Sequence, residues 1–92
     1  MALTFQWDNR KAANNLKKHA VSFEEAATAF ADPLSLTMAD PDHSEDEERF
    51  ILVGLSFRNR PLVVVHTERG DNIRIISARR ATRREKKQYE QG

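Results

Sequence analysis

The sequence predicts an α+β domain in which helices pack on an antiparallel sheet, in the order strand, two helices, a meander of strands and a final helix. Three observations lead to this prediction. Apolar residues recur at helical spacing between residues 9 and 31, strand-like runs joined by short turns fill residues 50–78, and the last residues form a polar, helix-favouring segment. Since 92 residues suffice for one small core, we expect residues 1–92 to form a single domain.

The N-terminal third carries the signals of a strand followed by two helices. Residues 3–7 alternate and are rich in aromatic side chains, which is typical of a short strand. Asp8 stands at an N-cap position before a helix over residues 9–19, whose basic last turn suits the helix dipole. Ser22 and Glu25 have capping-box spacing and predict a second helix, which a following Asp-Pro pair ends.

Strands and turns dominate the rest of the chain. Four runs have strand-like composition, and the links between the last three contain turn-forming residues, so we expect antiparallel hairpins. Thr82 and Glu85 again have capping-box spacing and predict a final helix beyond Ala81. The predicted strands cover residues 34–38, 50–57, 62–67 and 72–78, and the hairpin turns cover residues 58–61 and 69–71.

Strand alternation divides the predicted sheet into two faces. One face is uniformly apolar, and we expect the helices to cover it. This face consists of Ile51, Val53, Leu55, Phe57, Val63, Val65, Ile73 and Ile75. On the other, mixed face we expect His66 and Arg74 to lie close together in neighbouring strands, with Glu48 at the rim.

The expected group of His66, Arg74 and Glu48 has two interpretations. A histidine, a carboxylate and an arginine can perform general acid–base chemistry on a phosphodiester, with the guanidinium stabilising charge on the phosphoryl oxygens. Spacing alone favours the simpler alternative, in which His66 hydrogen-bonds within a half-buried sheet and Arg74 pairs with Glu68 across strands.

Two further segments carry side chains capable of chemistry. The acidic stretch at residues 39–48 has oxygen ligands for a hard metal but no recognised loop spacing, so we interpret it as a solvated loop and expect no metal site and no cofactor. His19 beside Lys18, at the end of the first predicted helix, is either catalytic or part of a helix C-cap.

Charge is distributed unevenly along the chain. The last 19 residues hold seven of the 15 lysines and arginines and carry a net +5, whereas the other residues carry −4. A solvated helix usually balances its charges, so this basic tail favours binding to nucleic acid or to an acidic protein. The chain has no cysteine, no signal-peptide pattern and no apolar run of ~20 residues, so we expect a cytoplasmic protein that does not enter membranes.

A further signal lies in four segments, which in chain order are FQWDNRKAANNLKKHAVSFEEAATAFADP, EERFILVGLS, VVVHTER and RIISARRATRREKKQYE. Together they resemble the BrnT family of bacterial type II toxins over nearly the whole chain. The resemblance implies a RelE-like fold, a metal-independent ribonuclease that inhibits translation, and a hetero-oligomer with a BrnA-like antitoxin, through which alone the toxin contacts DNA. The chain has Ala20 where the family usually has glycine; if this backbone position is left-handed, alanine costs up to ~1 kcal/mol.

The resemblance also implies which residues act on RNA. We expect the RNA 2′-hydroxyl to attack the adjacent phosphate while side chains transfer protons and stabilise charge. We infer that His19, Glu48, His66 and Arg79 are catalytic. The residues inferred to bind substrate are Lys18, Arg49, Arg69, Arg74, Arg80 and, from the basic helix, Arg83. Two other hypotheses stay open, a non-catalytic nucleic-acid-binding module and a protein-interaction module that uses the basic C-terminal helix.

Overall fold

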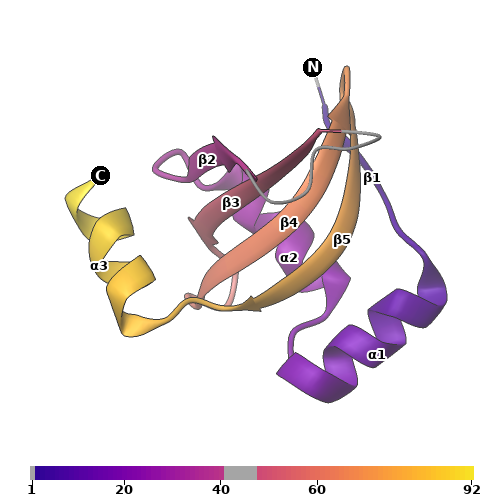
Figure 1. Ribbon diagram of the computed structural model, residues 1–92, viewed down its shortest axis with the longest axis horizontal. Coiled ribbons are helices and arrows are strands. Elements are labelled where there is room, and N and C mark those ends of the chain that lie inside the picture. Colours follow the sequence, from indigo (N-terminus) through magenta and orange to yellow (C-terminus); the bar gives the residue numbers. More distant parts are fainter. Residues whose placement is uncertain (1, 41–47) are drawn as a thin grey trace.

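A five-stranded sheet forms the centre of the molecule, with α1 and α2 packed on one face and α3 beside the other (Figure 1). The computed structural model describes residues 2–40 and 48–92. The strands lie in the order β1-β5-β4-β3-β2. The elements are β1 (Thr4–Gln6), α1 (Asn9–His19), α2 (Phe23–Thr28), the 3-10 helix η1 (Ala29–Ala31), β2 (Leu36–Ala39), β3 (Arg49–Leu55), β4 (Pro61–Arg69), β5 (Asn72–Arg80) and α3 (Arg83–Gln91).

The direction of β1 corrects the expectation of a wholly antiparallel sheet. β1 pairs in parallel with β5, whereas β2, β3, β4 and β5 pair antiparallel with one another. The two predicted hairpins form, with Asn59 and Gly70 in the left-handed conformation at their turns. No hairpin constrains β1, because two helices separate it from the remaining strands, so local sequence does not reveal its direction. None of the helices in the described part of the chain has the length and apolar composition needed to cross a membrane.

Both ends of α1 are formed by the residues that the sequence indicated. The Asp8 carboxylate accepts hydrogen bonds from the backbone N–H groups of Arg10 (2.8 Å) and Lys11 (3.2 Å). Ala20 ends the helix in the left-handed region, with φ 57° and ψ 31°, and donates its N–H to the Leu16 carbonyl. The backbone at Ala20 is therefore left-handed, as the cost expected for alanine at this position requires. Alanine here occupies a conformation that glycine adopts without strain.

The start of α2 departs from the predicted capping box. Ser22 accepts the expected bond from the Glu25 N–H at 3.0 Å. The Glu25 carboxylate does not return to the Ser22 backbone; it accepts bonds from the Arg60 guanidinium and from the Ser56 hydroxyl, the latter at 2.7 Å. A bidentate guanidinium is a stronger partner than a single N–H, so Glu25 joins α2 to the β3–β4 turn.

The helices cover the sheet face opposite to the one expected. Phe23 and Ala26 of α2 pack on a core that includes Leu62, Val64 and Ile75. The predicted face for the helices, which contained Ile51, Val53, Leu55, Val63 and Val65, is the other one in β3 and β4. A register shift between Val65 and His66 makes Ile73 and Ile75 pair with Glu68 and His66, so these two isoleucines join the helix-covered face. Such a bulge breaks the simple two-residue period on which the prediction rested.

Helix α3 is attached mainly by polar contacts. Thr82 and Glu85 form the predicted capping box. No residue of α3 is buried. The Glu85 carboxylate receives two hydrogen bonds from Arg79, and the Tyr89 hydroxyl donates to Asp32. Figure 1 shows α3 standing beside β3, away from α1.

Candidate functional site

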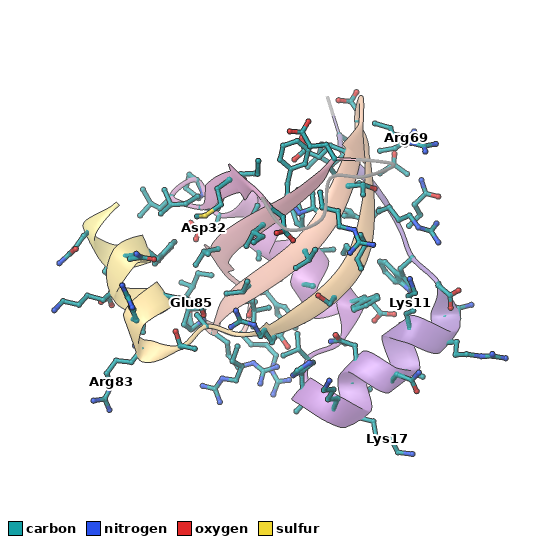
Figure 2. The ribbon with its side chains drawn as sticks, viewed as in Figure 1. Lys11, Lys17, Asp32, Arg69, Arg83 and Glu85 are labelled. Carbon is teal, nitrogen blue, oxygen red and sulfur yellow. The ribbon has the colours of Figure 1, made fainter. Side chains whose placement is uncertain are left out.

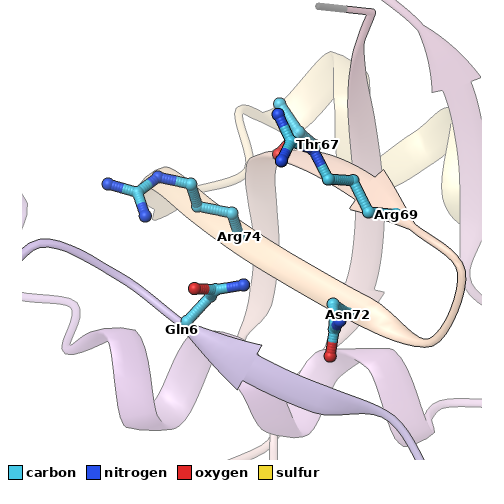
Figure 3. A pocket seen from close by; sticks show the side chains of 5 residues that line it. All are labelled: Gln6, Thr67, Arg69, Asn72 and Arg74. Carbon is cyan, nitrogen blue, oxygen red and sulfur yellow. The ribbon is translucent and has the colours of Figure 1, made fainter.

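A polar pocket of about 250 Å³ opens on the sheet face that α1 and α2 leave uncovered. Three strands contribute to it, because β5 lies between β1 and β4. Gln6 and Thr67 are both register partners of Arg74, and Arg69 is the partner of Asn72. Strand alternation aims these side chains toward the same face (Figure 3). We call this site the arginine pocket; it is lined by Gln6, Thr67, Arg69, Asn72 and Arg74.

The arginine pocket has the chemistry of an anion site. The guanidinium groups of Arg69 and Arg74 carry planar sets of N–H donors that match phosphate oxygens. Arg49 is the register partner of Thr67, which places a third arginine in the same row across the sheet. Within residues 2–40 and 48–92, no ion pair joins Arg49 or Arg74 to a carboxylate. The pocket therefore offers positive charge, amide groups and a hydroxyl, which suits a phosphodiester with a polar nucleoside attached.

The other predicted substrate-binding residues lie at the opposite end of the sheet. Arg74 and Arg80 are six residues apart on β5, which corresponds to about 20 Å along a strand. Figure 2 shows Arg69 and Arg83 at these separate ends of the molecule. The contacts of Ala20 with Arg60 and of Pro61 with Ala81 bring the end of α1, with Lys18 and His19, toward the Arg80 end. The structure thus divides the predicted site residues into two groups.

Arg79, predicted to be catalytic, is held by a carboxylate. Two of its guanidinium nitrogens each lie 2.8 Å from a Glu85 oxygen. This hydrogen-bonded pair lowers the pKa of Glu85 to about 2 and raises the pKa of Arg79. In this arrangement Arg79 anchors α3 to the sheet, and its catalytic assignment stays a prediction.

His66 does not lie beside Arg74. The register partner of His66 is Ile75, and its fully buried ring packs between Phe30 and Phe50 on the helix-covered face. Its Nε2 atom lies 2.9 Å from a Glu68 carboxylate oxygen. The expected proximity of His66 and Arg74 is therefore wrong, because the two side chains leave the sheet on opposite faces.

The expected pairing of Arg74 with Glu68 is not formed either. Glu68 faces Ile73 across the strands and contacts His66, while Thr67 faces Arg74. The contacts of His66 match the simpler hypothesis of a histidine that is hydrogen-bonded within the sheet. Its catalytic role stays a prediction.

Glu48 is next in sequence to Arg49, at the β3 end of the row formed by Arg49, Thr67 and Arg74. It is exposed and directly precedes Arg49 at the start of β3. The rest of the acidic stretch, residues 41–47, lies outside the described residues, and the expectation of a solvated loop there stays open. The described residues contain no cluster of His, Cys, Asp or Glu side chains that could hold a metal ion.

Three lining residues of the arginine pocket were missed at the level of sequence, namely Gln6, Thr67 and Asn72. Alternation offered a signal for two of them, because Thr67 shares a strand face with Arg69, and Asn72 shares one with Arg74. Gln6 carried no comparable signal, since its place depends on the pairing of β1 with β5.

Comparisons with known proteins identify the family. The model of the family described as "Ribonuclease toxin, BrnT, of type II toxin-antitoxin system" matches residues 7–85. Among solved structures, the ribonuclease toxin BrnT of Brucella abortus has a similar fold, with a TM-score of 0.64 and 19% identity over 89% of this chain and 100% of that chain. A comparison with curated proteins found no match. The family match spans most of the sequence, and its type II class implies a protein antitoxin as partner. The chain belongs to the BrnT family of ribonuclease toxins of type II toxin–antitoxin systems.

Proposed function

We propose that this protein is a cytoplasmic toxin that inhibits translation by cutting RNA without a metal ion, and that it binds the scissile phosphate in the arginine pocket. The observation that carries this proposal is the row of Arg49, Thr67 and Arg74 across three adjacent strands, with Arg69 beside it. These cations stand on a sheet face that α1 and α2 leave open. We further propose that the fold is of the RelE-like kind and that a DNA-binding antitoxin of the BrnA kind neutralises the toxin.

The proposed reaction is attack of an RNA 2′-hydroxyl on its own neighbouring phosphate. The 2′-oxygen forms a bond to phosphorus, the bond from phosphorus to the 5′-oxygen breaks, and the product end is a 2′,3′-cyclic phosphate. A base accepts the hydroxyl proton, and the departing 5′-oxygen takes up a proton. Negative charge grows on the phosphoryl oxygens, where one guanidinium donor contributes a factor of the order of 10²–10³ in rate.

Among the residues predicted to be catalytic, Glu48 best fits the role of the base. It is exposed and adjacent in sequence to Arg49, which lies in one row with Thr67 and Arg74. His66 is fully buried on the other face, so its imidazole supports the sheet beneath the site rather than contacting RNA. His19 lies in the last turn of α1, toward the Arg80 end, and can contact a longer RNA that extends across the sheet.

Product analysis tests this reaction. The purified protein is incubated with a labelled RNA and with DNA of the same sequence, with and without excess EDTA. We expect fragments ending in 2′,3′-cyclic phosphate, full activity in EDTA and no cleavage of DNA, which lacks the 2′-hydroxyl. Loss of cleavage in EDTA, restored by magnesium or manganese, would contradict the mechanism.

Growth tests the biological role. Expression of the chain alone should stop bacterial growth, and co-expression of the protein encoded beside its gene should restore it. Normal growth despite verified expression of folded protein would count against a toxin.

One observation favours the alternative of a protein-interaction module. Arg83, Arg84, Lys86 and Lys87 on α3 have no carboxylate partner in the described part of the chain. Such a surface attracts an acidic protein. If the purified chain cuts no RNA yet binds its neighbouring gene product in a salt-dependent way, this alternative replaces the ribonuclease proposal.

A further inference from the structure

Strand β2 is a four-residue edge strand that contains no charged residue and no proline. It spans Leu36–Ala39 and, among the strands that the structure describes, pairs only with β3. Natural proteins blunt sheet edges with charged residues, proline or a covering element. Residues 34–39 read LSLTMA and contain neither a charge nor a proline, in a chain that is 32% charged. The side chains of Leu34 and Met38 are 70% and 48% exposed.

Part of the β2 backbone has no hydrogen-bond partner among the described residues. The Asp40 N–H donates to the Arg49 carbonyl at 2.8 Å, so Asp40 and Arg49 form a hydrogen-bonded pair. Antiparallel pairs alternate, and therefore Met38 also directs its backbone groups toward β3. Thr37 and Ala39 direct their N–H and C=O groups outward. No residue described in the structure bonds to these outward groups.

The surroundings of β2 indicate the kind of partner that fits. Gly92, directly after α3, lies against the Leu36 side chain, and Tyr89 bonds to Asp32, so α3 borders this edge. Figure 1 shows α3 on the β2 side of the molecule, and its exposed cations are Arg83, Arg84, Lys86 and Lys87. A strand that joins β2 therefore meets apolar side chains at the edge and positive charge beyond it.

We propose that an extended segment of the antitoxin adds to the sheet at β2, pairing with Thr37 and Ala39 and directing acidic residues toward α3. Main-chain hydrogen bonds supply affinity in this mode of recognition, and side chains on either face supply specificity. The inference rests on the proposed function, since it takes the antitoxin as the occupant. The β2 edge is separate from the arginine pocket, whose lining residues stand on β1, β4 and β5.

The decisive experiment compares Thr37→Pro with Thr37→Val. Proline removes the outward N–H and spares the bonds to β3, a position that edge strands tolerate. Valine removes the hydroxyl and keeps the N–H. The probe is the purified protein encoded beside this chain's gene, and its affinity is measured by titration calorimetry. We expect Thr37→Pro to bind about 10- to 100-fold more weakly, because a partner carbonyl loses its donor and meets the proline ring, and Thr37→Val to bind like the unchanged chain.

A second pair of variants tests the apolar part of the edge. Met38→Glu places a charge among the apolar side chains that the antitoxin strand is expected to contact at the edge, and it should weaken binding. Leu16→Glu is the control, because Leu16 is a similarly exposed apolar residue on α1, at 52%. We expect Leu16→Glu to leave antitoxin affinity unchanged.

RNA cleavage by the same variants separates this inference from the proposed function. Thr37→Pro and Met38→Glu should cut RNA at the unchanged rate but resist neutralisation by the antitoxin. Equal affinity of Thr37→Pro and Thr37→Val for the antitoxin would overturn docking at β2. A second outcome would also overturn docking of the antitoxin at β2. If the chain is dimeric in the absence of antitoxin and the Thr37→Pro variant is monomeric, the edge binds a second copy of this chain. Absence of cleavage by every variant, with antitoxin binding intact, would overturn the ribonuclease proposal alone.

Discussion

Arg60 and Arg79 lie toward one end of the sheet and Arg69 and Arg74 lie at the other, and the fold offers these two pairs different partners. Arg60 donates two hydrogen bonds to the Glu25 carboxylate, and Arg79 donates two to the Glu85 carboxylate. Arg69 and Arg74 line a pocket whose other side chains are two amides and a hydroxyl. The first pair connects elements of the fold. In the second pair, Arg74 has no ion pair with a described carboxylate, and its side chain lines the pocket.

The role of each arginine, structural or ligand-binding, depends on the acceptor that the fold places beside it. Glu25 is a buried carboxylate, with its side chain 3% exposed, and it is distant in sequence from Arg60. Burying a carboxylate is unfavourable unless it is paired, so the fold requires Arg60 at that place. Within the described part of the chain no buried carboxylate pairs with Arg74, and we propose that it binds phosphate instead.

The largest expected effect is that of removing a structural arginine. Arg60→Ala leaves the Glu25 carboxylate buried without its main partner, and we expect a loss of about 3–5 kcal/mol in the free energy of unfolding. Urea unfolding followed by tryptophan fluorescence measures it. Arg58→Ala is the control, because Arg58 is 60% exposed and lies 3.8 Å from Glu25, and it should cost less than about 1 kcal/mol. Equal free energies of unfolding for the two variants would show that Arg60 stabilises the fold no more than the exposed Arg58.

The next effect should appear in activity and not in stability. Arg74→Ala removes a donor from the arginine pocket, and we expect RNA cleavage to fall by the order of 10²–10³ in kcat/KM while the free energy of unfolding changes by less than about 0.5 kcal/mol. Arg10→Ala, an exposed arginine on α1, serves as the matched control and should cut RNA normally. Full activity of Arg74→Ala would move the phosphate site away from the pocket.

A smaller effect is expected at the attachment of α3, and it depends on pH. The pKa of Glu85 is about 2 in the folded protein against an ordinary value of 4.5. Its stabilising contribution is therefore fully present above about pH 4.5 and is lost as the pH falls through 2. Because the pair is partly exposed, we expect Glu85→Gln to cost about 1–2 kcal/mol at pH 7 and to remove this part of the acid dependence.

Glutamine suits this test because it can still serve at the third position of a capping box, so only the charge pair is lost. Amide hydrogen exchange in α3, measured at pH 7 and at pH 4, reports whether the helix opens more often. If exchange in α3 is the same in Glu85→Gln and the unchanged chain at both values, the Arg79–Glu85 pair does not hold the helix.

The smallest effect concerns Ala20, whose carbonyl accepts a bond from Arg60 at 3.1 Å. Ala20→Gly relieves a left-handed alanine without touching either pair of arginines, so the free energy of unfolding should rise by up to ~1 kcal/mol. Cleavage should be unchanged. Thermal unfolding measures the change, and a destabilised Ala20→Gly would show that the alanine methyl contributes packing that outweighs its backbone strain.

Local features of this protein could be predicted from the sequence because their partners are a few residues apart. The Asp8 cap and the Thr82–Glu85 capping box depend on neighbours within three residues. The left-handed conformation at Ala20 was suggested only by the resemblance, because the family usually has glycine there. The hairpins follow from short turns between alternating runs. The family could likewise be recognised from the order of four segments, and the match over residues 7–85 confirms it.

The tertiary structure alone decided which residues share a site. One bulge beside His66 changed the face on which its neighbours in β5 lie, and the parallel pairing of β1 brought Gln6 to Arg74. The Glu25 carboxylate accepts hydrogen bonds from Arg60 instead of completing the capping box with Ser22, because the guanidinium, which is distant in sequence, is the stronger partner. Hydrophobic periodicity determines that a strand has two faces, but it does not determine which face the helices cover or which carboxylate reaches which arginine. Those choices depend on packing and on charge pairing between segments that only the folded chain brings together.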